Sequence, residues 1–407
     1  MKIGIIVIGN EILGGFTIDK NAAWIGQTLL NEGLRVHRKI TVLDQKNEII
    51  RAFDSLSEDC DIVISTGGLG PTIDDITTST LFEYFNDKPI YDESYWNKLK
   101  LYFNNKGMEI PPINRNQCYQ STTGKMIPNL KGSARGLFYH LEGKKYFILP
   151  GVPMEMKAMF EEFVLAEILK QTTEKFYCRS INTAAIAESL IHEKIIHLIE
   201  SEYYQGCEVS FLPHKMFGVD IRIMSTNPEV IDKLVDEITR ILEDNIYGYD
   251  GETLIESVTQ ALLSQKLTIS VAESCTGGLL GETFTNIAGS SAFFKGGVIC
   301  YSDELKRNLV HVSEKTLKKF GAVSYEVAEE LCRNIARICT TDIGIGITGV
   351  AGPGGGSKEK PVGLVFIGIF YQNNLYIHEY NLTSDRKTNR ELSITLCLNE
   401  LRKILIK

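Results

Sequence analysis

Short apolar runs alternate with segments of helical spacing along the first 170 residues. The runs rich in β-branched residues, which are typical of buried strands, are Ile3–Ile8, Val36–Leu43 and Asp61–Ser65. Apolar residues recur at helical spacing over Thr17–Leu30, Asn47–Leu56 and Asp75–Phe85. Fully apolar strands that alternate with helices predict a parallel or mixed sheet covered by helices on both faces.

The pattern changes between about residue 171 and residue 250. It predicts strands at Phe176–Asn182, Val209–Phe211 and Val219–Met224, and helices at Ala184–Glu200 and Pro228–Asp244. The order β-α-β-β-α indicates a small α+β module. A polar stretch at residues 247–252 separates this module from the last third of the chain.

Strand and helix alternation returns in the last part of the chain. The predicted strands are Leu267–Val271, Val298–Tyr301, Asp342–Thr348, Val362–Phe370 and Leu375–Tyr380, and the predicted helices include Val327–Ile338 and Arg390–Leu405. We therefore predict an α/β fold class, with two three-layer α/β domains joined by the small α+β module. The predicted domains are 1–170, 171–251 and 252–407.

Composition and charge exclude several classes of protein. Of the 407 residues, 43% are apolar and 23% are charged, which excludes a disordered or collagen-like chain. Residues 1–251 carry 26 basic and 35 acidic side chains, a net of −9, and residues 252–407 carry 17 and 16, a net of +1. Neither part has the basic excess expected of a protein that binds nucleic acid directly.

The sequence also favours a particular compartment. No apolar run approaches the roughly 18–20 residues that span a bilayer, so we expect no membrane partner. The run Ile3–Ile8 leads into a polar segment without a small-residue cleavage site, which favours a first strand over a signal peptide. The nine cysteines are scattered and include no CxxC pair, so a reducing cytoplasm is the expected location.

A first candidate site is the segment TGGLGPTIDD, residues 66–75, which follows an apolar strand and precedes a helix. Three glycines in it, Gly67, Gly68 and Gly70, let the backbone approach a phosphate closely. Asp74 and Asp75 offer the carboxylate oxygens that a divalent metal prefers, and Glu155 opens a later helix at the same sheet edge. The plainer alternative is that these acidic residues only cap or stabilise helix starts.

This front part resembles the molybdopterin-binding, MoaB/Mog-like domain of CinA proteins (competence/damage-inducible protein A). The matching stretches are GNEILGG with Asn21 downstream, TGGLGPTIDDIT and LPGVPMEM. The chain has Asn10 where the family usually has Thr, and GSARG where the family usually has GTAPG. The resemblance implies a pyrophosphatase that acts on ADP-ribose-like dinucleotides with a divalent metal ion of unknown identity.

A second candidate site begins at AESCTGG, residues 272–278, where a strand turns into a helix. Such a turn exposes Ser274, and free N–H groups at the helix start offer a site for a phosphate or a developing oxyanion. Lys306 is a candidate base, since a partly buried lysine can lose its proton near neutral pH, and Tyr301 could relay or position a proton. The alternatives are an exposed Lys306, and Cys275 either as the nucleophile or as a small buried residue.

Two later segments join this second site. The glycine-rich stretch TGVAGPGGG at 348–356 lies between apolar strands, which favours a pocket lined by backbone over a flexible linker. Arg386 and Arg390 lie four residues apart at the start of the last helix and share a face, so the pair could hold a phosphate, unless both are ordinary surface charges.

The last third resembles the CinA C-terminal domain, which is also known alone as the nicotinamide mononucleotide deamidase PncC. The match covers roughly 254–405 through AESCTGG, GGVICYSDELK, FGAVS, ITGVAGPGGG, KPVGLV and DRKTNR. The resemblance implies hydrolysis of nicotinamide mononucleotide to nicotinate mononucleotide and ammonia, without a cofactor. The residues that it carries over are Ser274 as nucleophile, Lys306 as base, Tyr301 and Thr348 lining the site, and, for substrate binding, Thr276, Gly277, Gly278, Gly349, Gly352, Arg386 and Arg390.

The middle module resembles the KH-like linker of full-length CinA proteins. Its one GxxG sequence, Gly248 to Gly251, follows the last predicted helix and is misplaced for clamping RNA, so a spacer or homodimer contact is expected. Together, the two activities that the resemblances imply would make the chain a bifunctional enzyme of pyridine-nucleotide salvage. Two alternatives to this hypothesis remain. One is an accessory protein of competence or DNA damage with a non-catalytic front domain, and the other is an enzyme in which only the deamidase is active.

Overall fold

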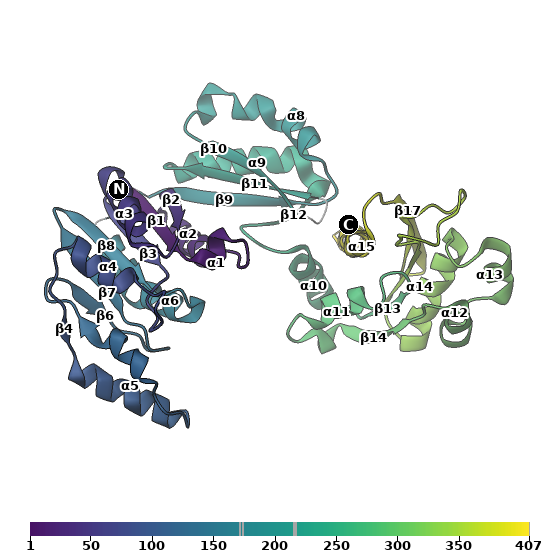
Figure 1. The fold of residues 1–407 in the computed structure, drawn as a ribbon. Coiled ribbons are helices and arrows are strands. Elements are labelled where there is room, and N and C mark those ends of the chain that lie inside the picture. The colour runs from purple at the N-terminus through teal and green to yellow at the C-terminus, as the bar shows by residue number, and fades with distance from the viewer. Residues whose placement is uncertain (171, 173–174, 215–217, 407) are drawn as a thin grey trace. The chain divides into compact units, whose positions relative to one another are not determined.

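The computed structural model describes residues 1–170, 172, 175–214 and 218–406 (Figure 1). The chain forms two compact units, Met1–Cys178 and Arg179–Lys407. The predicted boundary between 170 and 171 falls beside residues outside the described part of the chain. The division into three domains stays a prediction, although the second unit contains two separate sheets.

The first unit is built on a six-stranded mixed sheet in the order β2-β1-β3-β8-β7-β6. Its strands are β1 (Ile3–Ile8), β2 (Val36–Val42), β3 (Ile62–Thr66), β6 (Lys125–Ile127), β7 (Gly136–Leu141) and β8 (Lys144–Leu149). Strands β2, β1, β3 and β8 run parallel, and β7 and β6 continue the sheet antiparallel. A separate short pair joins β4 (Ile90–Tyr91) to β5 (Tyr119–Gln120).

Helices cover both faces of this sheet because its central strands are apolar on both sides. Ile3, Ile5 and Val7 pack in one core with α2 and α6, whereas Ile6 and Ile8 pack in another with α3 and α4. The helical segments are α1 (Asn10–Leu13), α2 (Asn21–Asn31), α3 (Lys46–Asp59), α4 (Thr77–Tyr84), α5 (Glu93–Asn105), η1 (Pro112–Cys118), α6 (Pro153–Met159), η2 (Phe160–Val164) and α7 (Leu165–Leu169). The predicted three-layer α/β arrangement is confirmed for this unit.

The second unit begins with a four-stranded sheet in the order β10-β11-β9-β12. Its elements are β9 (Tyr177–Thr183), α8 (Glu188–Ile199), η3 (Glu202–Tyr204), β10 (Glu208–His214), β11 (Gly218–Ser225), α9 (Pro228–Leu242), η4 (Glu243–Asn245) and β12 (Ile246–Tyr249). Apolar residues of α8 and α9 form one core with the sheet. The expectation of a polar separator at 247–252 is wrong for its first part, because residues 246–249 pair with β9 as a fourth strand.

The rest of the second unit is a five-stranded sheet in the order β14-β13-β15-β16-β17. Its elements are α10 (Leu254–Ser264), β13 (Ile269–Glu273), α11 (Leu279–Thr285), η5 (Ser290–Ala292), β14 (Phe294–Ile299), α12 (Asp303–Val310), α13 (Glu314–Phe320), α14 (Tyr325–Cys339), β15 (Ile343–Gly349), β16 (Leu364–Tyr371), β17 (Asn374–Asn381) and α15 (Arg386–Leu405). Strands β14, β13 and β15 are parallel, and β16 and β17 are antiparallel.

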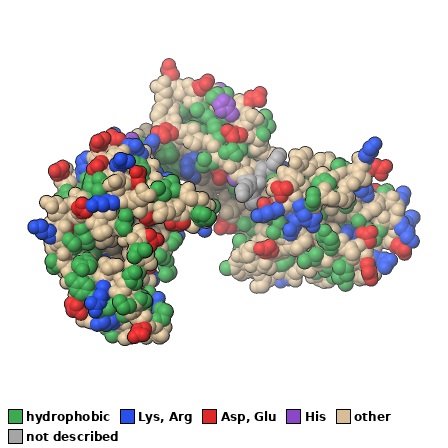
Figure 2. All heavy atoms as spheres, in the orientation of Figure 1, with side chains coloured by type: hydrophobic (Ala, Val, Ile, Leu, Met, Phe, Trp, Pro, Cys, Tyr) green, Lys and Arg blue, Asp and Glu red, His purple; other side chains and the backbone are tan. Residues whose placement is uncertain are grey.

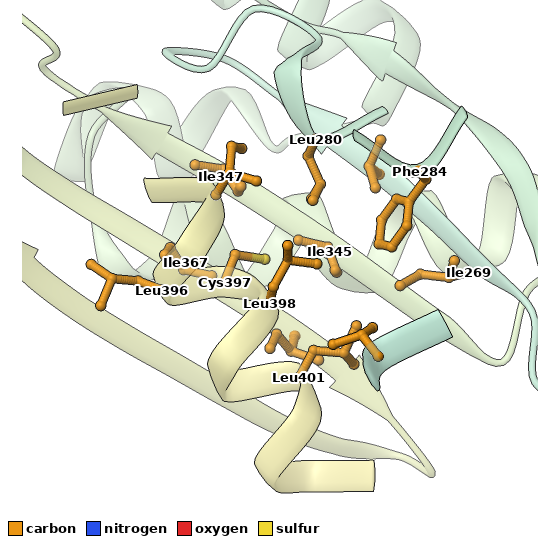
Figure 3. Packing of buried hydrophobic residues seen from close by; sticks show 14 of the residues in the cluster. Ile269, Leu280, Phe284, Ile345, Ile347, Ile367, Leu396, Cys397, Leu398 and Leu401 are labelled. Atoms are coloured by element: carbon orange, nitrogen blue, oxygen red, sulfur yellow. The ribbon is translucent and has the colours of Figure 1, made fainter. Parts of the chain in front are cut away.

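Helices cover both faces of this sheet as well. On one face, Leu398 and Leu401 of α15 pack over Ile345 and Ile367 of the sheet, beside Phe284 of α11 (Figure 3). On the other face, α12 and α14 pack against the sheet in two further clusters. Helix α15 begins at Arg386, four residues before the segment 390–405 that helical spacing predicted, because the side chain of Asp385 accepts hydrogen bonds from the N–H groups of residues 387 and 388.

The surface of each unit carries charges of both signs, as the absence of a basic excess in the sequence predicts. Lys and Arg side chains are interspersed with Asp and Glu on the face of each unit that Figure 2 shows. Among the described residues, no helix is long and apolar enough to cross a membrane.

Candidate functional site

Ser274 lies on the turn between β13 and α11, as predicted, but it is only 7% exposed, so the expectation that this turn exposes it is wrong. Its main-chain N–H donates to the carbonyl of Ile347 on β15 (N···O 3.0 Å), which holds the turn against the sheet. Gly277 and Gly278 follow with φ of +61° and +93°, in the left-handed region that favours glycine. The turn therefore places the side chain of Ser274 beyond the carboxyl end of β13, where α/β folds bind ligands.

Lys306 of α12 points at Ser274. The side chain of Ser302 accepts a hydrogen bond from the N–H of Leu305 and starts α12, which places Lys306 on its first turn. The lysine is only 1% exposed, and its Nζ lies 3.0 Å from Oγ of Ser274. The alternative of an exposed helix lysine is wrong.

The surroundings of Nζ suit either protonation state of Lys306. Besides Ser274 Oγ, it contacts the carbonyls of Cys300 at 3.0 Å and Tyr301 at 3.3 Å. An ammonium has three N–H groups for these three oxygens, whereas a neutral amine donates to the two carbonyls and accepts from the serine hydroxyl. A proton can thus pass from Oγ to Nζ without leaving a buried polar group unpaired.

Cys275 fits the role of a small buried residue better than that of a nucleophile. Its side chain is 6% exposed, and burial raises the pKa of the thiol to about 12. Because the thiolate is the reactive form of cysteine, such a thiol is inert near neutral pH. Ser274 is the nucleophile that the geometry favours.

Glu273 is a residue of this site that the sequence reasoning missed. It is 1% exposed, and its carboxylate accepts from the N–H groups of Gly278 at 3.1 Å, Leu280 at 3.0 Å and Gly281 at 2.8 Å. The expectation that the start of α11 offers free N–H groups to a substrate is therefore wrong for these three amides. The available signal was a carboxylate at the end of the strand that leads into the glycines before α11.

The other amides of the turn differ in whether an oxygen accepts from them. The N–H of Gly277 donates to the carbonyl of Ser274 at 3.1 Å, so neither predicted glycine, Gly277 nor Gly278, has its amide free. By contrast, within the described part of the chain, the N–H groups of Cys275 and Thr276 donate to no oxygen, although hydrogen bonds from both partly offset the effect of burial on the pKa of the Cys275 thiol. The buried hydroxyl of Thr276 also has no partner among the described residues.

The predicted arginine pair reaches the loops around Ser274. Arg390 donates from Nε and from one terminal nitrogen to the carbonyl of Thr276, at 3.1 and 2.7 Å. Arg386 donates to the carbonyl of Gly352 at 2.8 Å and to the hydroxyl of Tyr301 at 3.1 Å. Each arginine keeps further N–H donors for a ligand.

A pocket of about 630 Å³ opens beside these arginines. It is lined by Ala351, Gly352, Pro353, Val362, Ser384, Asp385, Arg386, Lys387 and Arg390. Three of these side chains are basic, and the one acidic side chain, Asp385, is bound to the start of α15. The pocket suits a phosphate because three of its four charged side chains are positive.

Thr348 and Gly349 shape the site from β15 rather than offering groups to a ligand. The hydroxyl of Thr348 is buried and donates to the carbonyl of Ala322 at 2.7 Å. A Cβ at Gly349 would lie 2.7 Å from the carbonyl oxygen of Leu364, so the strand needs glycine here for close packing.

In the first unit, the predicted glycines form a tight loop after β3. Gly67 has φ of +118°, and a Cβ there would lie 2.0 Å from the carbonyl oxygen of Ile8. Gly68 has φ of +67° and accepts from the N–H of Thr77, the first residue of α4. A Cβ at Gly70 would lie 2.2 Å from a carboxylate oxygen of Asp75. The loop therefore brings the backbone and an acidic side chain close together.

The three predicted metal ligands do not form one group. Asp75 accepts from the N–H and the hydroxyl of Thr72, and Glu155 accepts from the side-chain amide of Asn129. Asp74 is exposed. Among the described residues, no three His, Cys, Asp or Glu side chains gather in a way that could hold a metal ion. The set Asp74, Asp75 and Glu155 therefore does not fit a metal, and we derive no reaction step through one.

Asp44 is a further acidic residue near this loop that the sequence reasoning missed. Burial raises the pKa of its carboxyl group, and the charges of Glu11, Asp74 and Asp75 add to the rise. Its carboxylate accepts from the N–H of Asn10 at 2.8 Å. Asp44 follows β2, and only the parallel pairing of β2 with β1 brings it to the edge where the glycine loop lies.

The chain matches two family models. The model described as "Probable molybdopterin binding domain" matches residues 4–170, and the CinA C-terminal domain matches residues 251–405. A protein of Caldicellulosiruptor saccharolyticus, provisionally named a competence-damage inducible protein, is 38% identical over 412 residues, which cover all of both chains. A CinA-like protein of Dictyoglomus thermophilum is 35% identical over 414 residues, again over both full lengths.

A solved structure, that of the protein CinA with unknown function from Thermoplasma acidophilum, is 36% identical and covers 40% of this chain and 96% of its own, with a TM-score of 0.37. The relatives of equal length decide the assignment, because their identity extends over every part of the chain. This chain belongs to the CinA family.

Proposed function

We propose that the second unit is an amidohydrolase that converts nicotinamide mononucleotide to nicotinate mononucleotide and ammonia. The observation that carries this proposal is the 3.0 Å distance between Lys306 Nζ and Ser274 Oγ, with both side chains buried. A hydroxyl paired with a buried amine is the arrangement that a serine nucleophile needs.

The first half of the reaction acylates the serine. Oγ of Ser274 attacks the carboxamide carbon, and Lys306 takes the hydroxyl proton. The N–H groups of Cys275 and Thr276, which donate to no oxygen among the described residues, would stabilise the negative oxygen of the tetrahedral intermediate. The C–N bond then breaks, and Lys306 gives its proton to the leaving nitrogen. Ammonia departs, and the acyl group of the substrate stays on Oγ of Ser274 as an ester.

The second half restores the enzyme. Water attacks the ester carbon while neutral Lys306 takes a proton from it. The bond between the carbon and Oγ breaks, Lys306 protonates Ser274, and the carboxylate product leaves. The carbonyls of Cys300 and Tyr301 keep the amine in place through both halves, since they contact it in either protonation state.

Substrate selection rests on the pocket beside the arginines. Arg386 and Arg390 would hold the 5′-phosphate, while their bonds to Gly352, Tyr301 and Thr276 fix their own positions. A phosphate held there anchors the nucleotide at a distance from Ser274, so that binding energy orients the carboxamide.

The experiment that tests this function measures ammonia and nicotinate mononucleotide from nicotinamide mononucleotide. Nicotinamide riboside, which lacks only the phosphate, is the matched control substrate. We expect equal amounts of the two products and a much higher KM for the riboside. No ammonia from the nucleotide would overturn the proposal and favour the accessory role in competence or DNA damage.

For the first unit we propose binding of a nucleotide diphosphate, with hydrolysis of ADP-ribose as the reaction that the family resemblance implies. The glycine loop at residues 67–70 supports it, because Gly67 and Gly68 have positive φ angles and the close packing at Gly67 leaves no room for a Cβ, as in loops whose backbone approaches a phosphate. Binding of inorganic pyrophosphate tests the phosphate part directly. A chain that binds no pyrophosphate would contradict this second function.

A further inference from the structure

Residues 90–120 form a part of the first unit that has a small core of its own. The segment contains β4, α5, η1 and β5, and α5 lies at one end of the unit (Figure 1). Its apolar side chains gather in a cluster separate from the two cores of the six-stranded sheet, made of Trp96, Leu99 and Cys118 with Tyr95 and Ile110. A segment with a separate core can open while the sheet stays packed.

The two ends of this segment are fixed to the sheet by one carboxylate. Asp87, which is 7% exposed, accepts from the N–H of Thr122 at 3.0 Å and from its hydroxyl at 2.7 Å. It also accepts from the hydroxyl of Tyr139 on β7 at 2.8 Å and from that of Ser121. Because Asp87 precedes the segment and residues 121 and 122 follow it, the segment is anchored at one point, about which it can turn.

Arg135 holds the segment at a second point. It lies on the turn before β7, outside the segment, and its side chain is 8% exposed. One terminal nitrogen donates to the carboxylate of Asp92 at 2.8 Å, and the other donates to the carbonyls of Gln117 at 3.5 Å and Tyr119 at 3.4 Å. The guanidinium carbon lies 3.8 Å from the centre of the Tyr95 ring. One side chain thus contacts the start of α5, its first turn, η1 and β5.

The ion pair of Arg135 and Asp92 sets how easily the segment opens. The turn reads GSARG where the family usually has GTAPG, and a proline at this position has no side chain that could donate to Asp92. The carboxylate of Asp92 is only 14% exposed. Without the guanidinium it would be a buried charge with no counter-charge, and opening would return it to water. Loss of Arg135 therefore favours the open segment.

The closed segment forms one wall of a pocket of about 410 Å³ beside the glycine loop of the first unit. Asn116 lines this pocket and donates to the carbonyl of Pro71 at 3.3 Å. Gln117 lines it as well and donates to the carbonyl of Leu69, also at 3.3 Å. We propose that residues 90–120 are a lid that opens as one unit to admit a ligand to this pocket, and that Arg135 is the latch that holds the lid closed.

Hydrogen exchange, read by peptide mass on the full chain without a ligand, tests the lid. In the parent, the amides of α5 and η1 should exchange together and faster than those of β1 and β3. Arg135→Met should speed exchange in α5 and η1 by at least about tenfold and leave β1 and β3 unchanged. The control, Arg51→Met, removes an exposed arginine of α3 with its surface ion pair to Glu48 and should change none of these rates.

Asp92→Asn is a second variant, which also serves if Arg135→Met does not fold. Asparagine keeps an N-cap for α5 but removes the charge beside Arg135, so exchange in α5 should again rise while β1 stays unchanged. Added to Asp92→Asn, the change Arg135→Met should speed exchange less than it does in the parent.

Three results would overturn the proposal. If α5 exchanges no faster than β1 in the parent, the segment is not a lid. If the variants speed exchange in β1 and β3 as much as in α5, Arg135 stabilises the whole unit and is no latch. If the effects of Arg135→Met and Asp92→Asn simply multiply, the ion pair is not what holds the lid. Because no ligand is used, these outcomes do not depend on the pyrophosphate binding proposed for the first unit.

Discussion

Arg390 donates two hydrogen bonds to the carbonyl of Thr276, from Nε at 3.1 Å and from a terminal nitrogen at 2.7 Å. These bonds connect helix α15 to the turn that carries Ser274. The same residue lines the pocket proposed for the substrate phosphate. Under the proposed function, one side chain would therefore both bind the substrate phosphate and hold the turn that carries the nucleophile. This link explains why a phosphate far from the carboxamide would affect the chemical step as well as binding.

Arg390→Lys should lower kcat by about tenfold and raise KM. Lysine keeps the positive charge but cannot donate from two separate nitrogen atoms to the carbonyl of Thr276, as the guanidinium does. Steady-state rates of ammonia release check this. Arg337→Lys, at an exposed position on α14, is the matched control and should leave both constants unchanged. Equal effects of the two variants would contradict the role of Arg390.

Lys306→Met should lower kcat by about 10²–10⁴-fold, the usual contribution of a general base. Methionine is apolar and of similar length, so the buried site stays filled. Lys315→Met on the exposed side of α13 serves as control. Thermal unfolding of both variants separates lost chemistry from lost folding, and a folded, fully active Lys306→Met enzyme would remove the lysine from the mechanism.

Glu273→Gln should destabilise the turn, since a neutral amide cannot accept from Gly278, Leu280 and Gly281 as the carboxylate does. The expected loss in the free energy of unfolding is about 1–3 kcal/mol, the cost of leaving buried polar groups unsatisfied. Ammonia release should fall through kcat, with KM for the nucleotide nearly unchanged. Glu282→Gln, exposed on α11, should alter neither quantity.

Cys275→Ala should keep most of the activity, because the thiol is protonated at neutral pH. The folded pKa of about 12 lies above the ordinary value of 9.0, so the unfolded chain ionises first. The contribution of this thiol to stability is thus complete below pH 9.0 and declines as the pH rises from there toward the folded pKa. Iodoacetamide labelling at pH 8, read by peptide mass, should leave Cys275 unmodified; rapid labelling would contradict its burial.

The fold could be predicted to a large extent from the spacing of apolar residues. Runs such as Ile3–Ile8 and the pair near 362–380 identified strands, because burial on both faces leaves a clear pattern. Strand β12 was not predicted, because Tyr247 and Gly248 lie in a polar stretch and the strand depends on pairing with β9, which is distant in the sequence. Partners that lie far apart in the sequence leave no local signal.

The positions of the residues proposed to react could be predicted from the sequence, and those of the residues that support them less so. The turn at Ser274 and the arginines at 386 and 390 follow local patterns. The burial of Lys306, the three amides bound by Glu273 and the link from Arg390 to Thr276 arise from tertiary packing. For the carboxylates of the first unit, the local pattern was misleading. Asp75 and Glu155 suggested a metal site in the sequence, but in the structure they accept hydrogen bonds from Thr72 and Asn129.

The central claim is that Ser274 and Lys306 together hydrolyse the carboxamide. The most direct measurement is the rate of ammonia release from nicotinamide mononucleotide by Ser274→Ala, compared with Ser291→Ala, an exposed serine in the same domain. The account predicts that Ser274→Ala loses at least about 10³-fold in rate while remaining folded, and that Ser291→Ala matches the parent. A Ser274→Ala enzyme that releases ammonia as fast as the parent would contradict it.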